Sequence, residues 1–406
     1  MASVDELASL RFKMNKLPQH GGAPGDYEEK LAQWFLERSF FRDFTYRNPK
    51  GKKKGQELAD AVVLFDDVAL LVQVKAQHGK HEAKAWATEA ILKALKQVKN
   101  THDDLKSGAI KTLRNEVYGD LEFSPQTYPN MIGLIIVAQE IDPYDARVLI
   151  PEIWEAGFPL FVLSLKDVEL LTQRFDTAAD FINLLELKVD LGNQDTLLVN
   201  NEQHNLLRLY QQVPMIHKHR MQPITDEVLV KTVEAFRQTA SGELMMSPDW
   251  KYGLAIDDMI ARAHDVEESL PWNTDSEKVS AEIARFLGWL TRNRRIALGK
   301  RVVTMCVECA KTGKTDYFPH IQPSRGTVSV YLVSTMARKE RVELLQFLVT
   351  YAHFKYGTKQ AFGVATDAGV SGRSYDFMLI RKALSAEQIE ILKTLDDPFG
   401  QGAPLI

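Results

Sequence analysis

The sequence of 406 residues has only two cysteines and no apolar run that approaches the roughly 18 residues of a membrane-spanning helix. Two cysteines cannot build the disulfide framework that is typical of small secreted domains. The first residues, MASVDELASLRFKMN, carry acids early and lack the apolar core of a signal peptide. We therefore expect a cytoplasmic protein without a membrane partner.

The chain also lacks a global basic field, because its net charge is −4, and it shows no internal repeat and no low-complexity segment. Its apolar fraction of 45% and charged fraction of 26% are ordinary for a globular protein, so they favour no specialised class. Any affinity for nucleic acid must therefore come from local clusters of charge.

The two cysteines are Cys306 and Cys309, in the segment VVTMCVECA, which predicts a strand over 301–309. Residues three apart in a strand point to opposite faces. A structural zinc site needs four ligands, and the nearest further candidate is His320. We interpret both cysteines as ordinary buried or half-buried thiols.

Two short β-rich runs lie close together in the first half of the chain. AVVLF at 61–65 and VALLVQVKA at 68–76 are separated by Asp66 and Asp67. Two such runs joined by an acidic pair predict a β-hairpin.

Polar residues lie at one end of this hairpin. Side chains alternate along a strand, so Gln73 and Lys75 are expected on the same face. A lysine and an amide in an otherwise apolar strand need polar partners, and Asp60 is the nearest candidate in the sequence. An acid, a second oxygen ligand and a lysine that converge at a strand end suit a Mg²⁺ ion that activates water against a phosphodiester.

This pattern resembles the motif of the PD-(D/E)XK nuclease superfamily, which is an Asp, a gap, then Glu or Asp, any residue and Lys. Here it stands as Asp60, followed by Gln73-Val74-Lys75. The resemblance covers the N-terminal half and implies that Asp60, Gln73 and the Val74 carbonyl hold Mg²⁺, for which Mn²⁺ would substitute. It also implies that Lys75 orients or deprotonates the attacking water. Gln73 departs from the usual carboxylate, because an amide offers an oxygen but no charge.

The resemblance implies further site residues on two helices. Asp26 is expected to open a helix, and superfamily nucleases often carry a glutamate there that points at the metal. Glu28 is the better match and Glu29 the alternative, although the helix dipole favours a first-turn acid in any case. On the helix predicted over 82–106, Gln97 corresponds to a glutamine that related nucleases place near the active site. A boundary residue without such a role is the alternative interpretation.

A basic loop precedes the hairpin. It contains Arg47, Lys50, Lys52, Lys53 and Lys54, with no acid among them. Such clusters are usually solvated, but this one lies one short step from the expected phosphodiester site. Binding of the nucleic-acid backbone is an equally favoured interpretation.

The order of elements predicts an α/β fold of the restriction-endonuclease-like type, a mixed sheet flanked by helices. Further strands are expected at 43–48, 131–138 and 159–165, with helices at 145–156 and in two short segments after Ser164. Loss of periodicity over 189–202 predicts a nuclease domain at 1–190 and a C-terminal α/β or α+β domain at 200–406.

The second half is predicted to contain helices at 202–213, 225–239, 254–268, 275–297, 338–356 and 385–394, and strands at 301–309, 327–335, 360–366 and 375–381. It has no second acid–lysine motif, so we expect it to regulate or dimerise the nuclease. The Gly-, Ser- and Arg-containing loop at 367–374 is interpreted as a hairpin loop, with a ligand or partner contact as the alternative.

The sequence thus predicts a Mg²⁺-dependent endodeoxyribonuclease with little sequence readout, since no base-reading signature is apparent. RNA stays an alternative substrate, a homo-oligomer is expected, and restriction or anti-phage defence is a candidate role. The alternative is a catalytically degenerate nuclease-fold protein that binds nucleic acid or supports assembly, because Gln73 lacks the charge of a metal-binding acid.

Overall fold

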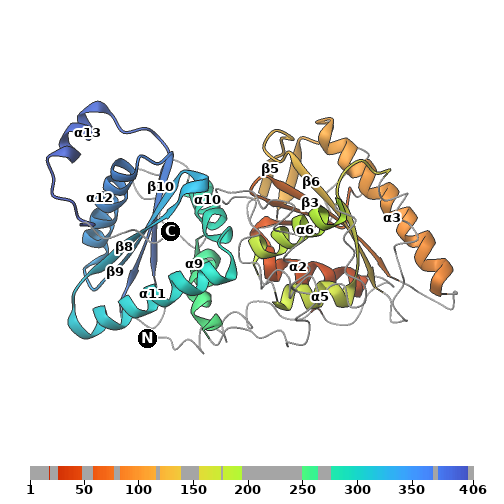
Figure 1. Ribbon diagram of the computed structural model, residues 1–406, viewed down its shortest axis with the longest axis horizontal. Helices are drawn as coiled ribbons and strands as arrows, with labels where there is room; N and C mark the ends of the chain where they lie inside the picture. Colours follow the sequence, from red (N-terminus) through yellow and green to blue (C-terminus); the bar gives the residue numbers. More distant parts are fainter. Residues whose placement is uncertain are drawn as a thin grey trace. The chain divides into compact units, whose positions relative to one another are not determined.

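The computed structural model describes Pro18 and residues 26–47, 58–76, 83–115, 119–138, 155–174, 177–193, 249–263, 276–368 and 374–400. The chain divides into two compact units after Val213, so the described residues up to Asn193 belong to the first unit and those from Asp249 to the second. Each unit is a mixed sheet flanked by helices (Figure 1). Within the described ranges, no helix is long and apolar enough to cross a membrane.

The first unit is built on a five-stranded sheet in the order β1-β2-β3-β6-β7. Its strands are β1 (Thr45–Arg47), β2 (Ala61–Phe65), β3 (Val68–Ala76), β6 (Asn130–Ala138) and β7 (Leu160–Ser164). β1, β2 and β3 pair in antiparallel fashion, whereas β3, β6 and β7 are parallel. The predicted hairpin and the mixed sheet are therefore confirmed.

Helices cover both faces of this sheet. They are α2 (Asp26–Phe44), α3 (Ala83–Lys106), α5 (Leu165–Arg174) and α6 (Ala178–Asn193). Figure 1 shows α3 on one side of the sheet and α2 and α5 on the other. The α3 residues Ala94 and Val98 pack against β2 and β3 residues such as Val62 and Leu71. Gly133 of β6 allows α3 to lie close, since a Cβ there would stand 2.9 Å from a methyl group of Val98.

The expected elements of this unit match the structure with three differences. The helix that begins at Asp26 runs to Phe44, so the strand expected at 43–48 is shortened to β1. A small hairpin of β4 (Thr112–Asn115) and β5 (Gly119–Glu122) was not expected. Most of the helix expected at 145–156 lies outside the described residues.

The second unit has a four-stranded sheet in the order β11-β10-β9-β8. Its strands are β8 (Asp316–Gln322), β9 (Thr327–Ser334), β10 (Gln360–Asp367) and β11 (Tyr375–Ile380). β9 and β10 are parallel and are connected by α12 (Arg338–Tyr356), and the other pairs are antiparallel. One face of the sheet packs its valines and alanines on α12, while Phe362 on the other face stacks on Phe286 of α10 (Ser276–Gly288).

The remaining described elements of the second unit are η2 (Trp250–Gly253), α9 (Leu254–Arg262), α11 (Arg292–Thr312), η3 (Pro323–Arg325) and α13 (Ala386–Lys393). The predictions for 327–335, 338–356, 360–366, 375–381 and 385–394 are confirmed to within two residues, and β8 was not expected. The helices expected at 202–213 and 225–239 lie outside the described residues. The domain boundary expected at 190–200 is described only as far as Asn193.

The strand predicted at 301–309 is wrong, because this segment is the second half of α11. Valines and a threonine favour a strand locally, but Leu298, Val302, Met305 and Cys309 recur at helical spacing and are buried together. Burial of one helix face therefore outweighs the local preference. Gly299 permits a close crossing with η2, since a Cβ there would collide with the carbonyl oxygen of Tyr252.

The helical geometry changes the argument about the cysteines but not its outcome. Cys306 and Cys309 lie one turn apart on α11, and both are buried free thiols. The helix expected over 275–297 is interrupted between Gly288 and Arg292, which separates α10 from α11.

Candidate functional site

The register of the β2–β3 hairpin brings two of the expected site residues together. Ala61 pairs with Val72, and the Asp60 amide donates a hydrogen bond to the Val72 carbonyl at 3.1 Å. This hydrogen bond holds Asp60, the residue before β2, against β3 at Val72, one residue before Gln73. The turn contains Asp66 at a φ of 56°, a conformation that Asp tolerates better than most residues.

The Asp60 carboxylate is directed along β3. Its Oδ2 accepts a hydrogen bond from the Val74 amide at 2.6 Å, and the residue is only 7% exposed. The side chain of Gln33, on α2, donates to the Asp60 carbonyl at 2.9 Å. Asp60 is therefore held from the strand and from a helix, beside the backbone of Gln73-Val74-Lys75.

Gln73 and Lys75 lie on the same face, as the alternation of the strand predicts. The Lys75 ammonium donates to Gln73 Oε1 at 3.3 Å, near the long end of the hydrogen-bond range. Gln73 is buried and Lys75 is half-buried. Burial lowers the pKa of Lys75, and the charge of Lys93 lowers it further, whereas the carboxylates of Asp60 and Glu29 act in the opposite direction.

The first turn of α2 contains both glutamates that the sequence left open. Glu28 and Glu29 are half-buried, and Glu29 is the one whose charge acts on the Lys75 ammonium. A role for Glu28 at a metal stays a prediction. Gln33 and Glu29 are four residues apart and so lie along one line of α2. That spacing could have identified Gln33 as a residue on the same side of α2 as Glu29. The sequence does not reveal that the Gln33 side chain bonds to the Asp60 carbonyl.

The α3 helix contacts the segment before Asp60 through Thr101. The Thr101 hydroxyl contacts the carbonyl oxygens of Leu58 and Gln97 and can donate to either. Among the described residues, the buried Oε1 of Gln97 has no hydrogen-bond donor. A buried carbonyl oxygen without a donor is costly, and a ligand that brings a donor or a cation would remove this cost.

The oxygen atoms at this site suit a hard cation that needs only one or two carboxylates, rather than one held by many acidic side chains. Within the described ranges, no group of three or more His, Cys, Asp or Glu side chains is arranged to hold a metal. Mg²⁺ is usually bound by one or two carboxylates, and waters and substrate phosphates complete its coordination. Asp60, the Gln73 amide and the Val74 carbonyl meet this lower requirement. The lysines of the basic loop, Lys50, Lys52, Lys53 and Lys54, lie outside the described residues.

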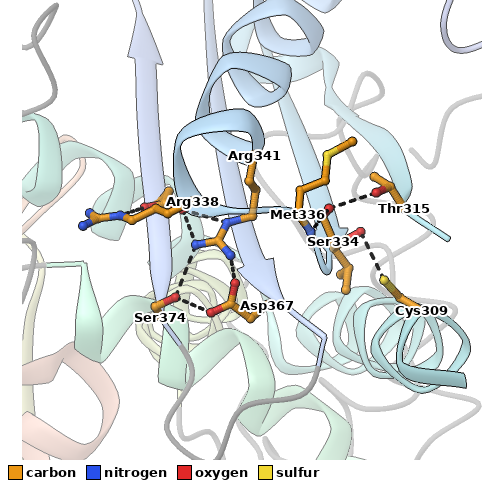
Figure 2. A network of polar contacts seen from close by, with 10 residues as sticks. Cys309, Thr315, Ser334, Met336, Arg338, Arg341, Asp367 and Ser374 are labelled. Carbon is orange, nitrogen blue, oxygen red and sulfur yellow. Dashed lines mark hydrogen bonds and ion pairs between the residues drawn. The ribbon is translucent and has the colours of Figure 1, made fainter. Parts of the chain in front are cut away.

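The second candidate region, the loop at 367–374, is a connection between antiparallel strands, as expected. Figure 2 shows Arg341 and Arg338, from the first turn of α12, turned toward the strand ends that flank this loop. Arg341 donates to Asp376 Oδ2 at 2.6 and 2.8 Å, forms an ion pair with Asp367, and contacts Ser374.

This cluster neutralises its own charges. Arg338 donates to the second oxygen of Asp376 at 2.8 Å, and Ser374 donates to Asp367 at 2.7 Å. Two arginines thus face two aspartates, which leaves no excess positive charge for an anion at these side chains. The described part of the loop serves to fasten β10 and β11 to α12, and the residues between Ala368 and Ser374 lie outside the description.

His320, the expected neighbour of the cysteines, is on β8. It is 3% exposed, and its Nδ1 lies 3.2 Å from Ser329 Oγ. Burial, with a contribution from the charge of Arg294, lowers its pKa to about 4. A buried neutral imidazole bonded to a serine is a structural part of the sheet.

Comparisons of this chain with protein-family models, with curated proteins and with solved structures found no match. The functional conclusion therefore depends on the chemistry of the site.

Proposed function

We propose that this protein is a metal-dependent nuclease that hydrolyses phosphodiester bonds of DNA, and that its first unit is a restriction-endonuclease-like domain. The observation that supports this most directly is the arrangement of Asp60, Gln73 and Lys75 at one end of the β2–β3 hairpin. Buried charges add little to stability compared with apolar residues of similar size. A half-buried lysine beside a buried acid is therefore better explained by chemistry than by folding.

The ligands proposed for the metal are Asp60, Gln73 and the Val74 carbonyl, and Mg²⁺ bound there, or Mn²⁺ in its place, would lower the pKa of a coordinated water. Glu28 and Glu29 are the acids on α2 that could contribute a further ligand directly or through water. The hydrogen bond between Asp60 and the Val74 amide holds the carboxylate beside the carbonyl of the same residue.

Lys75 is proposed to assist proton transfer and to stabilise charge. Its lowered pKa makes loss of a proton easier than for an exposed lysine, so it can take a proton from the attacking water. In its charged form it would stabilise the negative charge that develops on the phosphate. Gln97 is proposed to contact the nucleic acid or a water bound to it, because its Oε1 is buried and has no donor among the described residues.

The proposed substrate is DNA bound through its backbone, with Lys50, Lys52, Lys53 and Lys54 as phosphate contacts. Backbone contacts carry no direct sequence information, so cutting with little sequence preference is expected. The second unit is proposed to regulate the nuclease or to form a homo-oligomer, with restriction or anti-phage defence as the candidate role.

Purified protein incubated with supercoiled, linear and single-stranded DNA and with RNA tests the proposal. Cleavage is expected with Mg²⁺ or Mn²⁺ and none with EDTA. Asp60→Asn should abolish it, and Asp120→Asn, an exposed acid on β5, is the matched control. Equal cleavage by wild type and Asp60→Asn would show that the activity comes from another site.

A degenerate nuclease fold that only binds nucleic acid is the second candidate. It is favoured by one observation, that Gln73 is uncharged and its oxygen is already engaged by Lys75. Gln73→Glu separates the two functions, since it restores a charged ligand. An active enzyme should keep its activity in this variant and need roughly tenfold less Mg²⁺ for half-maximal cleavage. Inactive wild type together with an active Gln73→Glu variant would establish the degenerate alternative.

A further inference from the structure

Three polar groups of Asp60 are bound by two different elements. Its amide donates to the Val72 carbonyl at 3.1 Å, and its Oδ2 accepts from the Val74 amide at 2.6 Å; both partners are on β3. Its carbonyl accepts a hydrogen bond at 2.9 Å from the side-chain amide of Gln33, on α2. Asp60 is therefore fixed between the sheet and a helix, and the position of its carboxylate depends on both.

The hydrogen bond from Gln33 is shielded from solvent. Gln33 is 6% exposed and Asp60 is buried as well, so water does not readily replace the side-chain amide. A buried carbonyl that loses a donor is destabilised, and the segment that carries it tends to shift until it finds another partner. Loss of Gln33 should therefore displace Asp60 from its place beside Val74.

The same hydrogen bond joins α2 to the motif. Glu29 is four residues before Gln33 and so lies along the same side of the helix. Glu28 and Glu29 are the acids of α2 that are proposed as a further ligand, directly or through water. The contact of Gln33 with Asp60 thus links the two parts of the proposed metal site, the hairpin and the first turn of α2.

We propose that Gln33 is a positioning residue for the metal, which holds Asp60 and the first turn of α2 at the separation that one hard cation requires. This inference rests on the proposed nuclease function. Gln33 acts here as a hydrogen-bond donor through Nε2 and not as a ligand. Removal of a group that bonds to a metal-binding residue typically lowers metal affinity or activity by about ten- to a hundredfold.

The first unit contains a second hydrogen bond of the same kind, which provides a matched control. Asn115, on β4, donates through its side-chain amide to the Thr45 carbonyl of β1 at 3.1 Å, and it is 2% exposed. Both hydrogen bonds join a buried amide side chain to a backbone carbonyl distant in the chain. Gln33→Met and Asn115→Leu remove the donor at a similar side-chain size, so a general loss of stability would appear in both variants.

Metal binding is measured first, on the full chain without DNA, from the electron paramagnetic resonance signal of free Mn²⁺. Wild type should bind the ion and Asp60→Asn should not. Gln33→Met should bind it about ten- to a hundredfold more weakly, whereas Asn115→Leu should keep the wild-type affinity. Gln33→Asn keeps the amide on a side chain shorter by one methylene group. It should also bind more weakly, and it replaces Gln33→Met if that variant does not fold.

Three results would contradict the proposal. Wild-type affinity in the Gln33 variants, beside lost binding in Asp60→Asn, would overturn the positioning role and leave the metal site in place. Equal losses of affinity in Gln33→Met and Asn115→Leu would also overturn it, because the effect would then follow stability, which urea denaturation of both variants measures. Absence of Mn²⁺ binding by wild type would count against the metal site itself, and the inference would fall with it.

Cleavage is measured second, as a function of Mg²⁺ concentration. Gln33→Met should need about ten- to a hundredfold more Mg²⁺ for half-maximal cleavage. Saturating Mg²⁺ should restore most of the rate, because Gln33 aligns a ligand and is not assigned to the attacking water or the phosphate. A lowered rate that Mg²⁺ does not restore would contradict the assignment. Wild type that binds Mn²⁺ but does not cleave would instead count against the nuclease function.

Discussion

The Arg341 cluster of the second unit and the Asp60–Lys75 site of the first unit bury charge in opposite ways. In the second unit, Arg341 is matched by Asp376, Asp367 and Ser374, and every contact joins a donor to a charged or hydroxyl acceptor. In the first unit, the Lys75 ammonium donates to a neutral amide, and the buried Gln97 Oε1 on α3 has no donor among the described residues.

This difference indicates different uses of similar components. A cluster whose charges are balanced within the fold fastens a helix to two strands and gains nothing from a ligand. An arrangement with incomplete polar pairing loses stability in isolation and gains interactions when a cation or phosphate binds. The Arg341 cluster is thus structural, whereas the chemical role of the Asp60–Lys75 site is our proposal.

The largest expected effect comes from removal of the proposed catalytic lysine, Lys75, from the site in the first unit. Lys75→Ala is expected to lower the cleavage rate by roughly 10³-fold or more, because it removes charge stabilisation and a proton acceptor. Its thermal stability should stay near that of wild type or rise slightly, since a half-buried charge is lost. Lys106→Ala, an exposed lysine at the end of α3, is the control. Wild-type cleavage by Lys75→Ala would refute the site assignment.

The second unit should show the reverse response. Arg341→Ala leaves the buried carboxylate of Asp376 without its main partner and should lower the free energy of unfolding by about 3–5 kcal/mol. Arg338 bonds to the same aspartate, but its side chain is 49% exposed, so Arg338→Ala should cost less than about 1 kcal/mol. Urea denaturation of both variants checks this. Equal losses would mean that burial does not distinguish the two arginines.

Acid should weaken the second unit through His320. Because its pKa in the folded protein is about 4, below the ordinary value of 6.5, the unfolded chain binds the proton more readily. The stability is therefore fully present above pH 6.5 and is lost as the pH falls toward 4, by an amount on the order of 3 kcal/mol. Denaturation at several pH values, with His320→Gln as the comparison, measures this slope. An unchanged slope in the variant would assign the acid sensitivity to other groups.

The smallest expected effect concerns the basic loop. Replacing Lys52, Lys53 and Lys54 by alanine should weaken binding to all DNA sequences alike. It should also flatten the salt dependence of log affinity by up to about 0.9 for each lost phosphate contact. Anisotropy titrations over a range of salt give the slope, and a slope equal to that of wild type would identify the loop as a solvated surface.

Local patterns predicted the parts of the fold in which local preference and burial agree. The hairpin at 61–76 has apolar β-forming runs on both sides of an acidic turn, and α3 keeps one apolar face over its length. The strand predicted at 301–309, within α11, is wrong because valines and a threonine favour a strand locally, whereas the packed fold buries one face of a helix there. β8 was not predicted because its sequence contains Pro319 and shows no clear alternation of polar and apolar residues.

By itself, the sequence determined that Asp60, Gln73 and Lys75 would lie at one end of a hairpin, because strand alternation and a short turn are local properties. Only the tertiary structure decided what surrounds them. The contact of Gln33 with the Asp60 carbonyl and the contact of Thr101 with Leu58 both join segments distant in the chain. Such contacts depend on how helices pack on the sheet, and no local pattern specifies that packing.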